Sequence, residues 1–242
     1  MLGCGAVIDL HCHILPGVDD GAESMDDSLE MARALSGLGF RAVCCTPHVQ
    51  QALFSRAAAE LDELRCALQA AVDHEGLSLR LLPGGEHHAA EVLELVSEGR
   101  LLCYPGGDTF LLEFSLRGFP PRVDEMLFRF QVKGLRVVLA HVERYPEVQA
   151  DPAALAPLRA RGVSCLVNLS SLAGRWDADS QAAARATLRA GLIDAVSTDL
   201  HDPAGVAAVA EGLATLRGLV DAEAFQRLTC SAPAALAGAE GG

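Results

Sequence analysis

Short apolar runs alternate along the sequence with longer segments in which apolar residues recur every three or four positions. Each run has the length of a β-strand and is bounded by glycine, proline or polar residues. The runs cover residues 6–10, 41–46, 79–82, 109–114, 136–140, 164–168 and 195–198. This pattern predicts seven strands separated by helices.

The segments between the runs carry the signals of amphipathic helices. Ser24, with Asp27 three residues later, is typical of an N-cap, and apolar residues follow it at helical spacing. Residues 55–74 gather leucines on one face, and residues 123–130 repeat the pattern. The alanine-rich part from residue 205 onward is also expected to be helical.

Strand and helix alternate throughout, and no long linker, internal repeat or low-complexity tract interrupts them. Such alternation implies parallel strands joined by crossover helices. A chain of 242 residues is about the size of one α/β barrel domain. We therefore expect a single domain over residues 1–242, an α/β fold whose seven units close, or nearly close, into a TIM-like barrel.

The composition indicates which binding partners and which cellular compartment to expect. The formal net charge of −13 leaves no basic stripe for a polyanion such as DNA, and part of that charge could hold cations. No apolar stretch reaches the roughly 18 residues that would cross a membrane, and the first residues lack a signal-peptide pattern. The eight cysteines include no C-x-x-C pair. We expect a cytoplasmic protein with reduced thiols.

The segment Asp9-Leu10-His11-Cys12-His13 places two imidazoles at the end of the first predicted strand. Residues i and i+2 of a strand share a face, so His11 and His13 can close on one metal ion while Cys12 points away. The carboxyl ends of parallel barrel strands meet on one rim, where further ligands would complete such a site.

Residues of ligand type do follow the other predicted strands. The candidate metal ligands are His11, His13, Asp20, His48, Glu86, Glu113, His141, Asp199 and His201. Imidazole with carboxylate and without thiolate is the ligand set of Mn, Fe(II) or catalytic Zn. Nine donors exceed the needs of one ion, so we expect two or three divalent ions, which can bind the attacking and leaving oxygens of a displacement. Whether Asp19 also touches the site stays open.

Other histidines and two other chemistries can be judged by inspection. His74 ends an amphipathic helix and is expected to be solvated, while His87 and His88 could begin the next helix. No cysteine begins the C-x5-R sequence that a thiol-dependent phosphatase needs. A binuclear amidohydrolase usually bridges its metals with a strand-end lysine, but Lys133, the one lysine, falls in a predicted helix. Only a glutamate-bridged amidohydrolase stays open.

The ordered motifs of the sequence resemble those of a known superfamily. They read DLHCHILPGVDDG, TPH, GGE, LLEFS, AHVERY and STDLH, in that order. The set is similar to the polymerase and histidinol phosphatase (PHP) superfamily, and most closely to its bacterial capsular and exopolysaccharide tyrosine-phosphatase branch. The resemblance covers roughly residues 7–230. D-x-H-x-H alone is shared with amidohydrolases, whereas the run H-x-L-P-G-x-D-D-G together with H-x-E-R-Y is much narrower.

The resemblance implies a distorted seven-stranded barrel that holds three metal ions, often manganese, and hydrolyses phosphotyrosine by a metal-activated hydroxide. The implied ligands are His11, His13, Glu86 and Asp199 for the first ion, Glu86, Glu113 and His141 for the second, and Asp20, His48 and His201 for the third. Arg144 matches the family arginine that receives the phosphate, and Asp199 or His201 could donate a proton. The implied substrate is the tail of a tyrosine kinase that regulates capsular or exopolysaccharide synthesis.

Two other classes of function stay open. A small-molecule phosphatase of the histidinol phosphate type would share the metals and differ in the pocket. In a non-catalytic module, the metals would only stabilise a scaffold. Arg122 resembles a family position near the site, or is a surface residue at a helix start. The sequence does not indicate the oligomeric state.

Overall fold

The computed structural model describes residues 6–49 and 56–238, in which seven of the nine strands coincide with the predicted apolar runs. The nine strands are β1 (Val7–Cys12), β2 (Phe40–Cys45), β3 (His48–Val49), β4 (Arg80–Leu82), β5 (Glu86–His88), β6 (Thr109–Glu113), β7 (Arg136–Leu139), β8 (Ser164–Asn168) and β9 (Ala195–Ser197). All seven predicted strands are confirmed, and the short strands β3 and β5 are additions. The expectation that His87 and His88 begin a helix is wrong, because both lie in β5.

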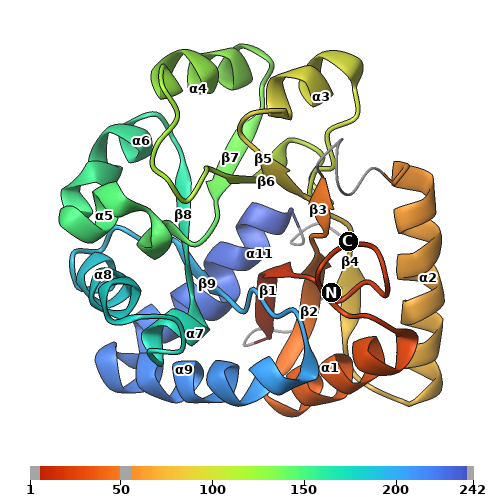
Figure 1. Ribbon diagram of the computed structural model, residues 1–242. Coiled ribbons are helices and arrows are strands. Elements are labelled where there is room, and N and C mark those ends of the chain that lie inside the picture. Colours follow the sequence, from red (N-terminus) through yellow and green to blue (C-terminus); the bar gives the residue numbers. More distant parts are fainter. Residues whose placement is uncertain (1–5, 50–55, 239–242) are drawn as a thin grey trace.

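Most of the helices connect the strands and surround them on the outside (Figure 1). The α-helices are α1 (Met25–Gly37), α2 (Ala58–His74), α3 (Val92–Glu98), α4 (Val123–Val132), α5 (Pro146–Ala150), α6 (Ala156–Ala160), α7 (Leu169–Leu172), α8 (Ala178–Arg189), α9 (Val206–Leu219), α10 (Ala222–Gln226) and α11 (Ala232–Ala237). Single turns of 3-10 helix are η1 (Val142–Arg144), η2 (Pro152–Leu155) and η3 (Pro203–Gly205), and η4 (Arg227–Ser231) is a π-helical turn.

The predicted helices are present, with bounds that differ from the prediction by a few residues. Ser24 caps α1, since its hydroxyl accepts a hydrogen bond of 3.2 Å from the backbone N–H of Asp27. α2 runs from Ala58 to His74, whereas residue 55, where that helix was predicted to begin, lies outside the described residues. Within residues 6–49 and 56–238, no helix is long and apolar enough to cross a membrane.

Every strand pairing among the described residues is parallel. Hydrogen bonds join β1, β2 and β4 into one sheet and β3, β5, β6, β7, β8 and β9 into a second, each in that order. β3 follows β2 after Thr46 and Pro47, and β5 follows β4 after residues 83–85. A bridge between Cys12 and Leu200 brings the end of β1 beside the segment after β9. The fold is mixed α/β with parallel sheets.

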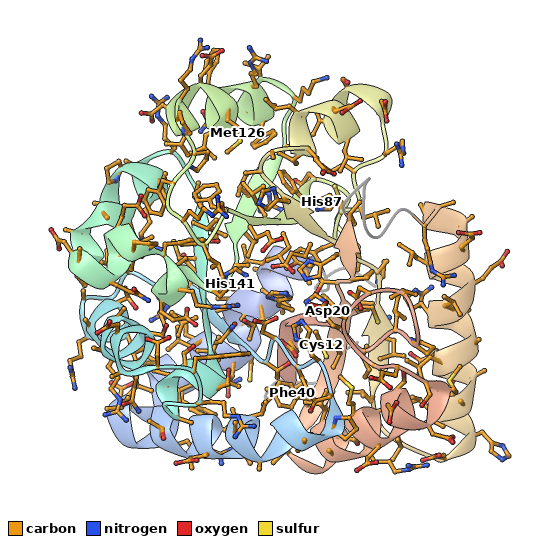
Figure 2. All side chains as sticks on the ribbon, in the orientation of Figure 1. Cys12, Asp20, Phe40, His87, Met126 and His141 are labelled. Atoms are coloured by element: carbon orange, nitrogen blue, oxygen red, sulfur yellow. The ribbon has the colours of Figure 1, made fainter. Side chains whose placement is uncertain are left out.

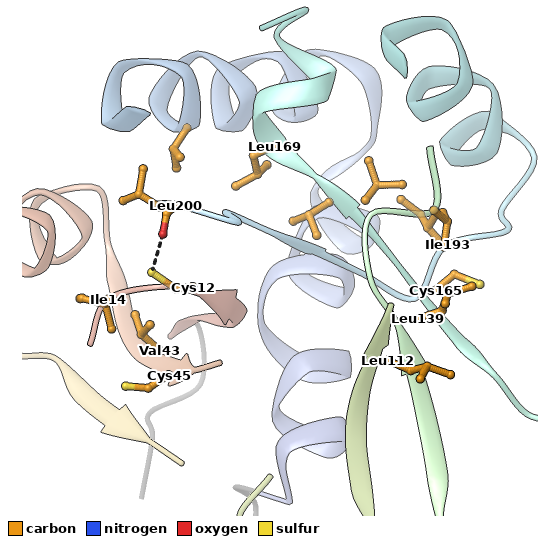
Figure 3. Packing of buried hydrophobic residues seen from close by; sticks show 14 of the residues in the cluster. Cys12, Ile14, Val43, Cys45, Leu112, Leu139, Cys165, Leu169, Ile193 and Leu200 are labelled. Carbon is orange, nitrogen blue, oxygen red and sulfur yellow. Dashed lines mark hydrogen bonds between the residues drawn. The ribbon is translucent and has the colours of Figure 1, made fainter. Parts of the chain in front are cut away.

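Apolar side chains pack on both faces of the strands, because successive residues of a strand point to opposite sides. The outer core lies between the strands and the surrounding helices, and Figure 3 shows part of it, including Cys12, Val43 and Cys45. The inner core lies on the opposite strand face and comprises Ile8, Leu10, Ala42, Cys44, Leu82, Tyr104, Leu111, Val138, Ala140, Leu166, Ala195 and Ala237. Ala237 comes from α11, so this helix covers part of the inner face.

The alternation of β1 changes phase just before its histidines. Ile8 and Leu10 belong to the inner core, but Cys12 belongs to the outer core. The pairing of β1 with β2 shifts in register between Asp9 and Cys12. A one-residue shift of this kind turns the following side chains to the opposite face. Cys12 therefore packs outward while His11 points the other way.

Candidate metal centre

All nine predicted metal ligands come together beside the carboxyl ends of the strands. We call them the donor cluster: His11, His13, Asp20, His48, Glu86, Glu113, His141, Asp199 and His201. Figure 2 shows Asp20 and His141 toward the middle of the molecule, inside the ring of helices, whereas Met126 of α4 lies at its periphery. The cluster draws on β1, β3, β5 and β6 and on the segments that follow β1, β7 and β9.

His11 and His13 face two buried carboxylates at the centre of the donor cluster. Their Nε2 atoms lie 3.0 Å apart. His11 Nε2 is 3.3 Å from Glu86 Oε2 and 3.3 Å from Asp199 Oδ1, and His13 Nε2 is 3.4 Å and 3.5 Å from the same two oxygens. Two imidazole nitrogens and two carboxylate oxygens thus surround one small volume.

Glu86 presents its two oxygens to different histidines. Oε1 lies 3.1 Å from His141 Nε2, and Oε2 lies 3.1 Å from His48 Nδ1. Glu113 lies beside the same two rings, with Oε2 3.8 Å from His141 Nε2 and Oε1 3.6 Å from His48 Nδ1. This arrangement suits a carboxylate that bridges two ions.

Asp20 and His201 form the more open side of the donor cluster. Asp20 Oδ1 is 3.4 Å from His48 Nε2 and 3.6 Å from His201 Nε2. The His201 ring stacks on His13 with 4.0 Å between the ring centroids. The Asp20 side chain is 59% exposed, whereas that of Glu86 is 1% exposed. The side of Asp20 is therefore the part of the cluster most open to solvent.

Burial and neighbouring charges shift the pKa values of the clustered carboxyl groups in opposite directions. Burial, together with the nearby Glu86 carboxylate, raises the pKa of Glu113 to about 7. Burial also disfavours ionisation of Glu86 and Asp199, but His11 and the other facing imidazoles outweigh it and hold both pKa values well below their usual range. Buried carboxylates of this kind need positive charge close by.

The donor set fits divalent metal ions. Ligand atoms about 2.0–2.2 Å from one ion lie roughly 2.8–3.6 Å from their neighbours in octahedral or tetrahedral geometry. The nitrogen–oxygen distances around Glu86, from 3.1 to 3.4 Å, fall in this range. A donor set of imidazole and carboxylate without thiolate is typical of Mn, Fe(II) or catalytic Zn sites, whereas structural zinc sites usually contain cysteine.

Asp19, which the sequence left open, orients two ligands of the donor cluster. Its Oδ2 lies 2.8 Å from His13 Nδ1 and accepts a hydrogen bond of 2.9 Å from the backbone N–H of His48. Burial disfavours the His13 imidazolium, yet the contact with Asp19, together with the carboxylates of Asp199 and Glu86, raises the His13 pKa well above its usual value. A carboxylate placed in this way fixes the tautomer and orientation of a metal-binding imidazole.

Asn168 and Glu143 support Asp199, and the sequence did not identify either as a site residue. Asn168 Nδ2 donates to Asp199 Oδ2 at 2.7 Å. Glu143 Oε1 accepts hydrogen bonds from the backbone N–H of Asn168 at 3.2 Å and from Ser171 Oγ at 2.6 Å. Only their positions in the sequence could have indicated them. Asn168 ends a predicted strand, and Glu143 lies between the candidate residues His141 and Arg144.

His141 and Asp199 adopt left-handed backbone conformations, with φ of 34° and 49°. For a residue with a Cβ atom, this region costs on the order of 1–3 kcal/mol and persists only where surrounding contacts enforce it. The His141 carbonyl accepts a hydrogen bond of 2.9 Å from Arg144 N–H, and Asp199 N–H donates to the His11 carbonyl at 2.8 Å. Of the three non-glycine residues with positive φ among the described residues, these two belong to the donor cluster, and the third, Arg122, precedes α4.

All members of the donor cluster except the buried His11 and His13 line a pocket of about 580 Å³. Other parts of the wall come from Leu116, Arg144, Ser170, Arg175, Trp176 and Val209. Arg144 Nη1 lies 3.9 Å from Asp199 Oδ2, and its guanidinium carbon lies 5.1 Å from the centroid of the Trp176 ring. The sequence singled out Arg144 but missed Arg175 and Trp176, which lie in a connection without a ligand-type motif.

The remaining histidines and Arg122 lie outside the donor cluster. His87 is fully buried, with Nδ1 3.0 Å from the Leu111 carbonyl and Nε2 3.1 Å from the backbone N–H of Leu102. Burial lowers its pKa to about 4, so it is a neutral core residue. His74 is exposed, as expected. The Arg122 side chain is 79% exposed and paired with Glu125, so it is a surface residue at the start of α4 and lies outside the pocket wall.

Sequence comparison finds relatives over most of the chain. The model of the family described as "Capsular polysaccharide synthesis, CpsB/CapC" matches residues 7–237. The tyrosine-protein phosphatase YwqE of Bacillus subtilis is 33% identical over 197 residues, which are 81% of this chain and 78% of that protein. The tyrosine-protein phosphatase CpsB of Streptococcus pneumoniae is 22% identical over 202 residues, 81% and 83% of the two chains.

Solved structures agree with the sequence comparison. One from a study of YwqE of B. subtilis and CpsB of S. pneumoniae, called unique metal-dependent tyrosine phosphatases, matches with a TM-score of 0.86 and 31% identity. The match covers 95% of this chain and 94% of that one. Histidinol phosphate phosphatase of Lactococcus lactis matches with a TM-score of 0.55 at 13% identity, covering 94% and 97% of the chains, and shows a shared fold alone.

Proposed function

Because the chain belongs to the CpsB/CapC family of capsular polysaccharide synthesis, we propose that it is a metal-dependent protein-tyrosine phosphatase. Water adds to the phosphorus of phosphotyrosine, the bond from phosphorus to the phenolic oxygen breaks, and inorganic phosphate and tyrosine leave. One observation carries the proposal. Imidazole and carboxylate side chains form groups of three or four whose ligand atoms lie within 4.8 Å of one another, beside a pocket that Arg144 also lines.

We propose that the donor cluster holds two or three divalent ions, with manganese first and iron or zinc as alternatives. The proposed sites are His11, His13, Glu86 and Asp199, then Glu86, Glu113 and His141, then Asp20, His48 and His201. The two-sided contacts of Glu86 support a bridging role. When bound, such ions lower the pKa of a coordinated water and neutralise the charge of the phosphate oxygens.

Arg144 would orient the phosphate group. Its planar guanidinium lies in the pocket wall near Asp199 and can donate two parallel hydrogen bonds to phosphate oxygens. The tyrosyl leaving group has a pKa of about 10 and needs less protonation than an alkoxide. Since Asp199 and His201 both face other members of the donor cluster, we propose that they bind metal and do not act as proton donors.

The decisive experiment measures hydrolysis of a phosphotyrosine peptide by the purified protein with manganese. The His141→Ala variant should lose at least about a hundredfold in kcat/KM, because Glu86 and Glu113 lose their shared imidazole partner, while its circular dichroism stays unchanged. His74→Ala, an exposed histidine at the end of α2, should keep full activity. Full activity of a demetallated sample would contradict the proposal.

The same assay separates the other candidate functions. A histidinol-phosphatase-type enzyme would turn over histidinol phosphate faster than the phosphotyrosine peptide. A non-catalytic module would bind metal and hydrolyse neither substrate. We favour the peptide because relatives at 33% and 22% identity are named tyrosine-protein phosphatases.

We propose that the two sheets form one distorted (β/α)7 barrel of the PHP type in a single domain. β3 follows β2, and β5 follows β4, each after a break of two or three residues, so nine strands reduce to seven strand paths. The bridge between Cys12 and Leu200 supports closure between the first path and the last.

We also propose a class of substrate and a compartment. The substrate would be a phosphotyrosine protein of capsular or exopolysaccharide synthesis, such as the tail of a bacterial tyrosine kinase, and the family description supports this class. The enzyme would act in the cytoplasm. Seven cysteines among the described residues are free, and proteins of oxidising compartments usually pair theirs.

A further inference from the structure

Part of the pocket wall is apolar although it is open to solvent. Among the described residues, five large apolar side chains are more than a third exposed: Leu116, Phe128, Val132, Trp176 and Leu219. Two of them, Leu116 at 44% and Trp176 at 51%, line the pocket that also contains the donor cluster. Exposed apolar surface inside a polar pocket indicates that the ligand itself carries an apolar part.

Contacts on two sides hold Trp176 in place. Its Nε1–H donates a hydrogen bond of 3.1 Å to Ser170 Oγ, and the guanidinium of Arg144 lies 5.1 Å from its ring centroid. The next residue, Asp177, caps α8 by accepting a hydrogen bond of 2.7 Å from Ser180 N–H. The indole is therefore preorganised, so its side chain would lose little conformational entropy when an aromatic ligand binds.

Arg144 links this apolar wall to the donor cluster. Its guanidinium lies over Trp176 and reaches to 3.9 Å from Asp199 Oδ2. A phosphate bound by Arg144 and the donor cluster would therefore lie next to the indole. In phosphotyrosine a single oxygen joins the phosphate to the ring, so the ring must occupy the space directly beside the phosphate.

We propose that Trp176 and Leu116 form an aryl subsite that contacts the ring of the substrate and selects aryl phosphates over alkyl phosphates. The inference rests on the proposed function, and it names the residues that would determine the substrate class of the enzyme. Aromatic rings pack edge-to-face or offset against an indole, and this gain is added to the removal of apolar surface from water. A phosphoserine side chain reaches the same phosphate position without a ring and gains neither contribution.

The single tryptophan of the chain makes the subsite directly observable. Benzylphosphonate, a non-hydrolysable aryl probe, should change the emission of Trp176 in the metal-loaded protein, and inorganic phosphate should reverse the change. Propylphosphonate should bind more weakly and change the emission less. If benzylphosphonate binds, as calorimetry would detect, without altering the emission, the ring lies elsewhere and the aryl subsite is wrong.

Variants separate ring binding from the positioning of Arg144. Trp176→Ala should lower the affinity for benzylphosphonate by roughly 10- to 100-fold more than that for propylphosphonate. If the substitution only loosens Arg144, it lowers the affinities for both phosphonates equally, and the ratio of the two affinities stays unchanged. Trp176→Phe, which keeps an aromatic face, should restore most of the preference. Phe128→Ala removes a similarly exposed aromatic side chain outside the pocket wall and should leave both affinities unchanged.

Failure of this inference differs from failure of the proposed function. If the wild-type protein hydrolyses phosphotyrosine peptide and Trp176→Ala weakens both phosphonates equally, Trp176 only positions Arg144 and the aryl subsite is overturned. If the wild-type protein hydrolyses no phosphotyrosine peptide with manganese, iron or zinc, the proposed function fails. The phosphonate titrations need no turnover, and they then decide the subsite on their own.

Discussion

At the scale of single residues, the histidines divide according to what faces their ring nitrogens. The Nε2 atoms of His11, His13 and His141 face carboxylates, whereas both nitrogens of His87 meet backbone groups. Glu86 and His87 are neighbours in β5, so their side chains point to opposite faces of the strand. One of them joins the donor cluster and the other joins the core.

His87 should contribute to stability and not to chemistry. His87→Ala is expected to lower the free energy of unfolding by about 2–4 kcal/mol, because it opens a cavity and removes the imidazole that contacts the Leu111 carbonyl and the Leu102 N–H. Urea unfolding in the presence of a chelator measures this without a metal contribution. His88→Ala, at the half-buried next position, should cost much less. Equal losses for the two variants would contradict this account.

Asp19 should tune metal binding without being a ligand. Asp19→Asn keeps the shape of the side chain but removes the negative charge facing His13 Nδ1, so metal affinity is expected to fall by about 10- to 100-fold. Calorimetric titration with manganese measures the change. Asp26→Asn alters an exposed carboxylate in the first turn of α1 and serves as the control. An unchanged affinity in Asp19→Asn would show that packing alone orients His13.

At the scale of elements, the sequence predicted the strands that contain two or more apolar residues and missed those that contain fewer. β3 and β5 contain two and three residues, too few for any periodicity, and they include histidine and glutamate. The register shift in β1 was also invisible, because it depends on pairing with β2. The ligands could nevertheless be predicted, since their selection needed only their place after a strand.

Helix α9 allows a sharp test of packing between elements. A Cβ atom on Gly212 would lie 2.1 Å from the Leu169 carbonyl oxygen of α7, whereas one on Gly218 meets nothing within 4 Å. Gly212→Ala should therefore destabilise the protein by about 1–3 kcal/mol. Gly218→Ala should stabilise it by roughly 0.5–1 kcal/mol through helix propensity. Thermal unfolding of the two variants tests both signs, and a shift in the same direction for both would refute the packing argument.

At the scale of the whole molecule, the donor cluster gathers buried charge that the fold must hold together. Glu86, Glu113 and Asp199 lie near one another, and the Glu86 charge contributes to the raised pKa of Glu113. Ions that bind the folded state alone stabilise it by mass action, about 2.7 kcal/mol at a free concentration one hundred times the Kd. The melting temperature should rise with added manganese and fall with a chelator.

His141→Ala provides the control for this prediction of stability. The variant lacks one donor, so manganese should raise its melting temperature less than that of the wild-type protein. His74→Ala should behave as the wild type, because its side chain is exposed at the end of α2. Identical melting curves with manganese and with chelator, for the wild-type protein, would show that the cluster takes up no ion under those conditions.

The sequence predicted less of the pocket than of the donor cluster, again for a physical reason. Ligands follow strands, whose directions are set by the sheet, but Leu116, Arg175 and Trp176 lie in connections whose paths depend on the packing of their neighbours. Arg144 was accessible only through its resemblance to a family motif. The gathering of the donor cluster could thus be predicted from the sequence, while the shape of the pocket required the fold.

The bridge between Cys12 and Leu200 also sets the order in which the protein can mature. These two positions are 188 residues apart, and Asp199 and His201 flank the later one. At a synthesis rate of roughly 5–20 residues per second, the ribosome adds them about 10 to 40 s after His11 and His13. A nascent chain therefore lacks Asp199 and His201, two of the nine proposed ligands, for most of its synthesis. If the donor cluster binds metal as proposed, we expect the ions to enter late, after the last strand has joined the first.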